Sequence, residues 1–145
     1  MKPGTIYIFS IYGQNLLNFI TQPNNDPEGV LIRAVQPENG ISLMKERRQT
    51  NGFNLTNGPG KLCQAMNINL RLNTQMLNQS PLKIDLSSSL TKYPVKISTS
   101  GRVGVPHKGK WTRAPLRYYV TGNPYVSKMP KERMDFKYYG WKTKN

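Results

Sequence analysis

The order of apolar and polar positions predicts an antiparallel sheet in the first part of the chain. Residues 5–12 (TIYIFSIY) are almost all β-branched or aromatic, which predicts a strand buried on both faces. Residues 15–21 (NLLNFIT) predict a second strand, and residues 22–29, rich in Pro, Asn and Asp, predict a turn. The apolar run 29–35 (GVLIRAV) predicts a central strand that carries one charge, Arg33. Three strands joined by short turns indicate antiparallel pairing.

Helical patterns follow this sheet. Residues 38–48 (ENGISLMKERR) predict a helix with basic residues in its last turn, and residues 49–57 predict a polar loop. Residues 58–66 (GPGKLCQAM) predict a second helix that begins near Pro59. Residues 73–78 predict a short third helix.

The C-terminal half predicts short strands followed by a basic, aromatic tail. The expected strands cover residues 82–85, 95–98, 102–105 and 116–120. The tail, residues 130–145, has no clear period and predicts a loosely packed extension. Together these elements predict one α+β domain over residues 1–145, with a curved antiparallel sheet and a few helices on one side.

The charge points to a polyanionic partner. The formal net charge is +14, and it is uneven: residues 1–60 carry 5 Lys/Arg against 4 Asp/Glu, whereas residues 61–145 carry 16 against 3. Lys and Arg alternate with Tyr and Trp in that half, which favours phosphate contact with stacking, and hence nucleic acid, over a merely solubilising surface. No apolar stretch approaches the roughly 20 residues of a membrane span.

Other candidate chemistry is sparse. The single cysteine, Cys63, excludes an intramolecular disulfide, which suits the cytosol, and its helical setting favours a core residue over a nucleophile. Cys63 and the lone His107 do not have metal-ligand spacing. The GPGK segment, residues 58–61, could hold one phosphate at a helix N-terminus or be an ordinary turn. The seven carboxylates include no pair suited to acid–base work. The residues alone predict a basic, nucleic-acid-binding domain and name no reaction.

Three stretches, taken together, carry a specific resemblance. They are GTIYIFSIY followed by LLNFIT, then PEGVLIRAVQPENG, and then TNGPGKLCQAMNI with the closing SGRVGVPHKGKWTRAPLRYYVTGNPYVS. In this order and spacing they resemble alkyladenine (3-methyladenine) DNA glycosylases, especially the Gram-positive bacterial forms. The resemblance runs from residue 1 to about residue 129.

The resemblance implies a fold and an activity. The fold would be one α+β domain with a barrel-like antiparallel sheet. The activity would be flipping of alkylated or deaminated purines out of double-stranded DNA and hydrolysis of the N-glycosidic bond, in base-excision repair. It also implies a monomer without metal or organic cofactor and without membrane attachment, in the cytoplasm and associated with the nucleoid.

The family pattern implies roles for two aromatic residues and an amide. Tyr12 matches the residue that wedges into the stack, Phe9 an aromatic wall of the base pocket, and Asn18 a pocket asparagine that screens bases. The simpler alternatives are a strand-end surface tyrosine for Tyr12 and strand core for Phe9.

The pattern also implies roles for three basic residues and one carbonyl. Arg33 and the carbonyl of Val103 match groups that hold the attacking water, and Lys61 and Arg102 are candidate phosphate contacts. An arginine inside an apolar run needs an anionic partner, because an unpaired buried charge is costly.

One departure from the family bears on catalysis. The family places a stretch similar to ETEAY, whose Glu is the general base, and a pocket His ahead of the matching region; neither occurs in these 145 residues. We therefore expect this chain to be an N-terminally truncated glycosylase that contains the C-terminal two-thirds of the family domain. The alternative is a catalytically inactive remnant that only binds DNA non-specifically. A third alternative, an RNA-associated structural protein, fits the charge but not the collinear GPGKLCQA and RVGVPHKG segments.

Overall fold

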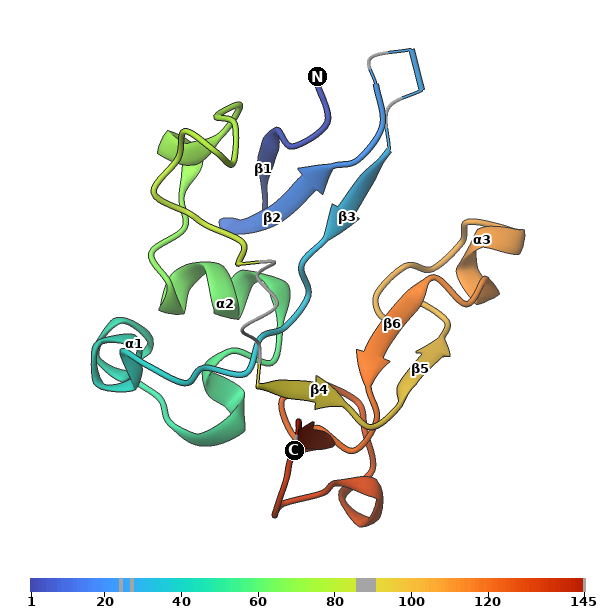
Figure 1. Ribbon diagram of the computed structural model, residues 1–145. Coiled ribbons are helices and arrows are strands. Elements are labelled where there is room, and N and C mark those ends of the chain that lie inside the picture. The colour runs from blue at the N-terminus through green and yellow to red at the C-terminus, as the bar shows by residue number, and fades with distance from the viewer. Residues whose placement is uncertain (24, 27, 86–90, 145) are drawn as a thin grey trace. The chain divides into compact units, whose positions relative to one another are not determined.

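The fold was analysed in a computed structural model, which describes residues 1–23, 25–26, 28–85 and 91–144. The chain divides into two compact units, residues 1–86 and 87–145 (Figure 1).

Unit 1 is built on a three-stranded antiparallel sheet. Its strands β1 (Ile6–Ile11), β2 (Gln14–Ile20) and β3 (Gly29–Leu31) lie in chain order, as Figure 1 shows. The predicted antiparallel pairing is therefore confirmed. β3 ends at Leu31 rather than at residue 35, although the Ile32 amide still donates to the Leu17 carbonyl at 2.9 Å.

In the described residues of unit 1, two helices and two 3-10 turns follow the sheet. They are α1 (Ile41–Arg48), η1 (Gly52–Leu55), α2 (Pro59–Ala65) and η2 (Leu70–Leu72). The predicted helix over residues 73–78 is wrong, because this segment pairs with the outer edge of β1 instead. The Ile6 amide donates to the Gln75 carbonyl at 2.8 Å, and the Thr74 amide donates to the Ile6 carbonyl at 2.9 Å.

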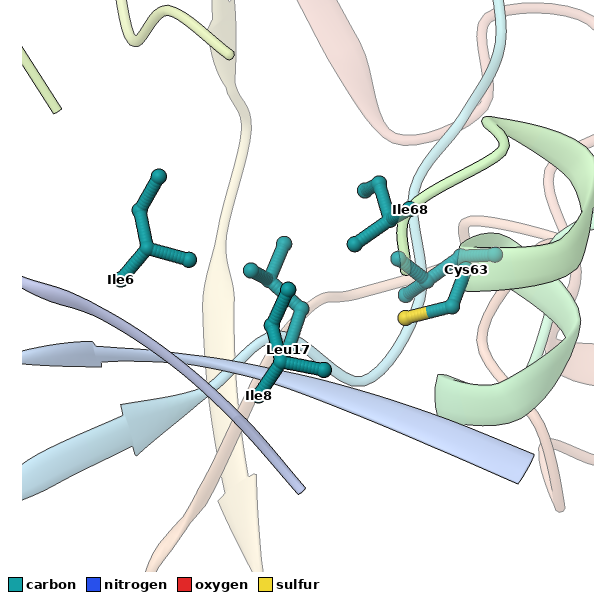
Figure 2. Packing of buried hydrophobic residues seen from close by; sticks show 6 residues of the cluster. Ile6, Ile8, Leu17, Cys63 and Ile68 are labelled. Carbon is teal, nitrogen blue, oxygen red and sulfur yellow. The ribbon is translucent and has the colours of Figure 1, made fainter. Parts of the chain in front are cut away.

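The core of unit 1 lies between α2 and one face of the sheet. Side chains alternate along a strand, so Ile6 and Ile8 of β1 point to the same face as Leu17 of β2. Figure 2 shows these side chains gathered with those of Cys63 and Ile68; all members of the cluster, which also includes Leu62, are at most 4% exposed. Burial of each large aliphatic side chain contributes about 1.5–3 kcal/mol.

The opposite face of the sheet is largely open. Phe9 is 36% exposed and Ile11 is 45% exposed. The prediction that residues 5–12 are buried on both faces is therefore wrong. Among the described residues of unit 1, a helix packs against one face, and Tyr7 and Phe9 of β1 fall on the other.

Two arginines at the end of α1 fasten that helix to its neighbours. Arg48 donates through Nε to the Leu55 carbonyl at 3.2 Å and through Nη1 to Gln64 Oε1 at 2.7 Å. Arg47 donates through Nη1 to the Ala65 carbonyl at 3.0 Å. The basic last turn thus binds η1 and the C-terminal end of α2, where free carbonyls attract cations.

Unit 2 holds two small antiparallel sheets. β4 (Lys92–Pro94) pairs with β7 (Trp141–Thr143), and β5 (Ile97–Ser100) pairs with β6 (Arg117–Val120). A short helix α3 (Lys110–Arg113) and a 3-10 turn η3 (Lys131–Arg133) lie in the connections. Residues 82–85, in unit 1, and 102–105, predicted as strands, are not strands; the second segment turns at Gly104, whose φ is +74°.

The expected barrel-like sheet is not present among the described residues. The strands form three separate sheets of two or three strands each. The strands of unit 2 are only three or four residues long, and residues with positive φ interrupt the chain between them. Segments this short cannot supply the continuous ladder that a closed sheet requires.

The C-terminal tail is tied into unit 2 by Asp135. Its Oδ1 accepts from the amides of Lys137 and Tyr138, each at 3.0 Å, and its Oδ2 accepts from the Gly140 amide at 3.1 Å. The Gly140 carbonyl in turn accepts from the Val95 amide at 2.8 Å, next to the β4–β7 pair. The expected loosely packed extension is therefore wrong for this part of the tail.

These bonds make unit 2 sensitive to acid. Hydrogen bonds from the backbone amides of Tyr138 and Gly140 lower the pKa of the Asp135 carboxyl. A lowered folded-state pKa gives stability that is present above the unfolded value, about 3.9, and is lost as pH falls through the folded value. We expect the chain to have a lower melting temperature at pH 3 than at pH 6. In the Asp135→Asn variant, the difference in melting temperature between the two pH values should be smaller. Equal acid sensitivity in the two proteins, followed by circular dichroism, would contradict this role of Asp135.

Candidate functional site

The β1–β2 hairpin ends in a strained, fully exposed tyrosine. Tyr12 and Gly13 form the two-residue loop between the strands, with φ values of +50° and +74°. Two successive positive φ values are typical of a type I′ turn, whose first position favours Asn, Asp or Gly. A tyrosine there costs on the order of 1–2 kcal/mol in backbone strain. Tyr12 is nevertheless 97% exposed, so its ring gains no packing against the described residues of unit 1 that would compensate for that strain.

An aromatic and amide surface lies on the sheet face that α2 does not cover. The rings of Tyr7 and Phe9 stack with centroids 5.7 Å apart and an interplanar angle of 27°. Asn18 pairs with Tyr7 across the strands, so its side chain is on the same face. Its Nδ2 donates to the carbonyls of Tyr7 and Leu16, each at 3.3 Å, which holds the carboxamide against the sheet.

Arg33 follows the end of β3 in unit 1. Leu31, the last residue of β3, pairs with Asn18, and the Ile32 amide donates to the Leu17 carbonyl. Arg33 itself is half-buried and lies beyond the strand. The fold thus brings Phe9 and Asn18 to one face of the sheet, with Tyr12 at the end of the hairpin and Arg33 just after the strand that pairs with Asn18.

Lys61 is held at the start of α2. Its Nζ donates to Asn57 Oδ1 at 2.9 Å and also to Asn54 Oδ1. Burial lowers the pKa of Lys61, and the positive charge of Arg48 lowers it further. An ammonium group has three donors, so two amide bonds leave one N–H for a ligand.

The two remaining predicted residues lie in unit 2. Arg102 is exposed, and its Nη2 donates to the Trp111 carbonyl at 3.0 Å, closing the loop that precedes β6. Val103 is half-buried at the turn with Gly104, and its carbonyl accepts no hydrogen bond from the described residues. Arg33 is in unit 1, so the two residues assigned to water binding belong to different units.

Cys63 is a core residue, as its sequence context indicated. It is 1% exposed, and burial raises the pKa of its thiol, which disfavours the nucleophilic thiolate. His107 is an exposed loop residue. Within the described ranges, no three His, Cys, Asp or Glu side chains gather as a metal site. In the same residues, no helix has the length and apolar character needed to cross a bilayer.

Comparison with known proteins identifies the family. A family model for methylpurine-DNA glycosylase matches residues 1–124. The chain belongs to the methylpurine-DNA glycosylase family. A Staphylococcus saprophyticus protein named "Putative 3-methyladenine DNA glycosylase" is 51% identical over 139 residues, which cover 96% of this chain and 68% of that protein.

Relatives with the same name extend this result to other Gram-positive bacteria. The protein of Lactiplantibacillus plantarum is 44% identical, with 97% of this chain and 66% of the relative covered. The protein of Enterococcus faecalis is 45% identical, with 97% and 61% covered. The chain therefore spans about two thirds of the length of these curated relatives.

In this member of the methylpurine-DNA glycosylase family, α2 makes a close contact with the hairpin tip that the sequence analysis did not predict. Gly60 of α2 is buried, and a Cβ added there would lie 2.0 Å from Gln14 Oε1 and 2.9 Å from Gln14 Cβ. Gln14 follows the Tyr12–Gly13 turn directly. Because the contact includes the Cβ atom of Gln14, rotation of the glutamine side chain cannot relieve it fully. The absence of a side chain at residue 60 therefore sets how closely the hairpin tip approaches α2.

We expect Gly60→Ala to destabilise the chain by about 1–3 kcal/mol through overpacking, although alanine normally stabilises a helix interior by about 1 kcal/mol relative to glycine. Gln14→Gly in the Gly60→Ala background removes all three contacting atoms and should restore most of the loss. Gly58→Ala is the matched control, because a Cβ there meets only the flexible side chain of Lys61. Urea unfolding of the four proteins of the double-mutant cycle measures the coupling. Additive effects of the two substitutions would rule out this contact as the cause.

Proposed function

We propose that this chain supplies the DNA-wedging and base-holding part of a 3-methyladenine DNA glycosylase, which hydrolyses the N-glycosidic bond of alkylated purines in duplex DNA during base-excision repair. The observation that carries the proposal is Tyr12, strained at the tip of a hairpin and 97% exposed. Strained backbone persists where the surrounding structure and function require it. Family membership and the names of the relatives support the same activity.

The charge supports DNA as the partner. The chain has 21 Lys/Arg against 7 Asp/Glu, and residues 87–145 alone have 13 against 2. Several cations of unit 2 lie over exposed aromatic rings. Lys110 Nζ is 5.2 Å from the ring centroid of Trp111, and Lys137 Nζ is 4.8 Å from that of Tyr138. Cations paired with aromatic rings suit a polymer that offers both phosphates and bases.

The proposed first step is extrusion of the damaged nucleotide. Unstacking and unpairing cost a few kcal/mol, least for a damaged base. The ring of Tyr12 would fill the vacated space and replace part of the lost stacking. Phe9, stacked on Tyr7, would offer its π face to the purine, and an alkylated purine that carries positive charge is attracted to such a face. Asn18 would test the edge of the base with its carboxamide oxygen.

The proposed chemical step is attack of water on the sugar carbon C1′. A carbon–oxygen bond forms, the carbon–nitrogen bond to the base breaks, and its electron pair goes to the purine, which neutralises the charge of the alkylated base. Arg33 and the Val103 carbonyl would orient the water, and Lys61 and Arg102 would contact DNA phosphates. The water must also give up a proton to a general base. The family assigns this role to a Glu in a stretch that is not among these 145 residues.

Base extrusion can be tested with a fluorescent base in duplex DNA. 2-Aminopurine placed beside an alkylated purine gains fluorescence when its neighbour leaves the stack. We expect the chain to raise this signal and Tyr12→Ala to reduce the extrusion equilibrium about tenfold, which corresponds to about 1.4 kcal/mol. Alanine is too small to replace the lost stacking.

The matched control is Tyr118→Ala. Tyr118 is also exposed, at 69%, but lies within strand β6 of unit 2. Removal of the Tyr118 ring should leave the fluorescence gain nearly unchanged. The Tyr12→Trp variant should also keep the fluorescence gain. If Tyr12→Ala and Tyr118→Ala had equal effects, Tyr12 would be a general contact and not the wedge.

A second prediction concerns the missing proton acceptor. A polypeptide of these 145 residues should excise 3-methyladenine from duplex DNA several orders of magnitude more slowly than a full-length relative, because the Glu that the family uses as general base is not among them. Single-turnover excision from a labelled duplex measures this. Excision at the relative's rate would show that another residue of this chain takes the proton.

A further inference from the structure

A shallow surface pocket with mixed polar and apolar lining lies beside the hairpin, apart from the aromatic sheet face. It has a volume of about 440 Å³ and is lined by Asn15, Asn67, Asn69, Leu70 and Arg71. Asn15 comes from β2, and the other four residues come from the loop after α2 and from η2. None of these residues has a role in the proposed glycosylase mechanism.

Two of the asparagines are fixed in place by their own surroundings. Asn15 accepts from Ser10 Oγ at 2.6 Å and donates through Nδ2 to the Ile68 carbonyl at 3.4 Å. Asn69 accepts from the Arg71 amide at 3.0 Å and donates through Nδ2 to the Asn67 carbonyl at 3.2 Å. The bond from Asn15 to Ile68 joins the hairpin to the loop after α2, and the bonds of Asn69 fix the loop itself.

The remaining groups of the pocket are donors and an apolar contact. Arg71 is exposed, and within the part of the chain that the structure describes its guanidinium makes no hydrogen bond or ion pair. Asn67 is exposed and has a positive φ of +56°, and Leu70 is 55% exposed. The lining contains no carboxylate. A guanidinium beside carboxamide donors suits an anionic oxygen ligand, most of all a phosphate, which Arg can bind through two parallel N–H bonds.

We propose that this pocket holds a backbone phosphodiester of DNA near the base that Tyr12 replaces. The DNA setting rests on the proposed function. Asn15 is the second residue after the Tyr12–Gly13 turn, so the pocket begins about 7 Å along the strand from the hairpin tip. That distance corresponds to about two nucleotide steps of about 3.4 Å each. Arg71 binds the phosphate, Asn67 donates to it, and Leu70 packs against the adjoining deoxyribose.

The test is the salt dependence of binding of the full chain to undamaged duplex DNA. Each neutralised phosphate contributes about 0.9 to the slope of log K against log salt. We expect Arg71→Ala to reduce the slope by about 0.9 and Arg71→Lys to retain it, because lysine keeps the charge. Asn67→Leu should weaken binding without changing the slope, since a neutral donor releases no counterion.

Lys45→Ala is the control for the general field of a basic protein. Lys45 is exposed in α1 of the same unit and does not line the pocket. Equal loss of slope in Lys45→Ala and Arg71→Ala, or an unchanged slope in Arg71→Ala, would overturn the proposal. Titration with inorganic phosphate separates the two sources of this chemistry. Chemical shifts of Asn67 and Asn69 that saturate with phosphate alone, together with an unchanged DNA slope in Arg71→Ala, would assign the pocket to free phosphate and refute the DNA contact.

Failure of the phosphate pocket and failure of the proposed Tyr12 wedge give different results. A Tyr12→Ala variant that extrudes bases normally would refute the wedge and leave the slope measurement standing. A normal slope in Arg71→Ala, with loss of base extrusion in Tyr12→Ala, would refute the pocket and leave the wedge.

Discussion

The packing of the β1–β2 hairpin on α2 is the interaction on which the rest of unit 1 depends. Ile8 and Leu17 fix the hairpin against Cys63, and this contact determines which face of the sheet is buried. Because side chains alternate along a strand, the aromatic and amide positions must then lie on the opposite face. Phe9 and Asn18 are available to a ligand as a direct consequence of the apolar packing behind them. The core and the candidate site are two sides of one sheet.

The same packing holds the strained tip of the hairpin. A positive φ at Tyr12 is unfavourable in isolation, but twelve residues of paired strand around it determine the turn geometry. Gly60 allows the strand after the turn to lie close to α2, and Asn15 then joins the hairpin to the loop after that helix. These contacts leave little freedom for the turn, while the tyrosine ring itself remains in solvent. In the proposed wedge role, such an arrangement would let the ring insert without a large loss of conformational entropy.

Unit 2 follows a different principle, because its strands are too short to bury a large apolar face. Backbone hydrogen bonds to side chains supply much of its organisation: Asp135 holds three amides, and Asn123 joins the Tyr125 amide to the Tyr139 carbonyl. A unit organised in this way can tolerate a surface dominated by Lys and Arg, since few apolar side chains are needed inside. Its high positive charge is then available for a polyanion.

The sequence by itself determined the local elements with strong patterns. The alternation in residues 5–21, the Pro59 start of α2 and the collinear family segments identified the sheet, the helix and the family. Only the tertiary structure decided which face of residues 5–12 is buried, because both faces carry apolar side chains and a helix packs on one. It also decided that residues 73–78 pair with β1, that Asn54 and Asn57 hold Lys61, and that the tail forms β7. Each of these outcomes depends on a partner distant in the chain or on a side-chain contact across a loop, and local hydrophobic periodicity contains no information about such partners.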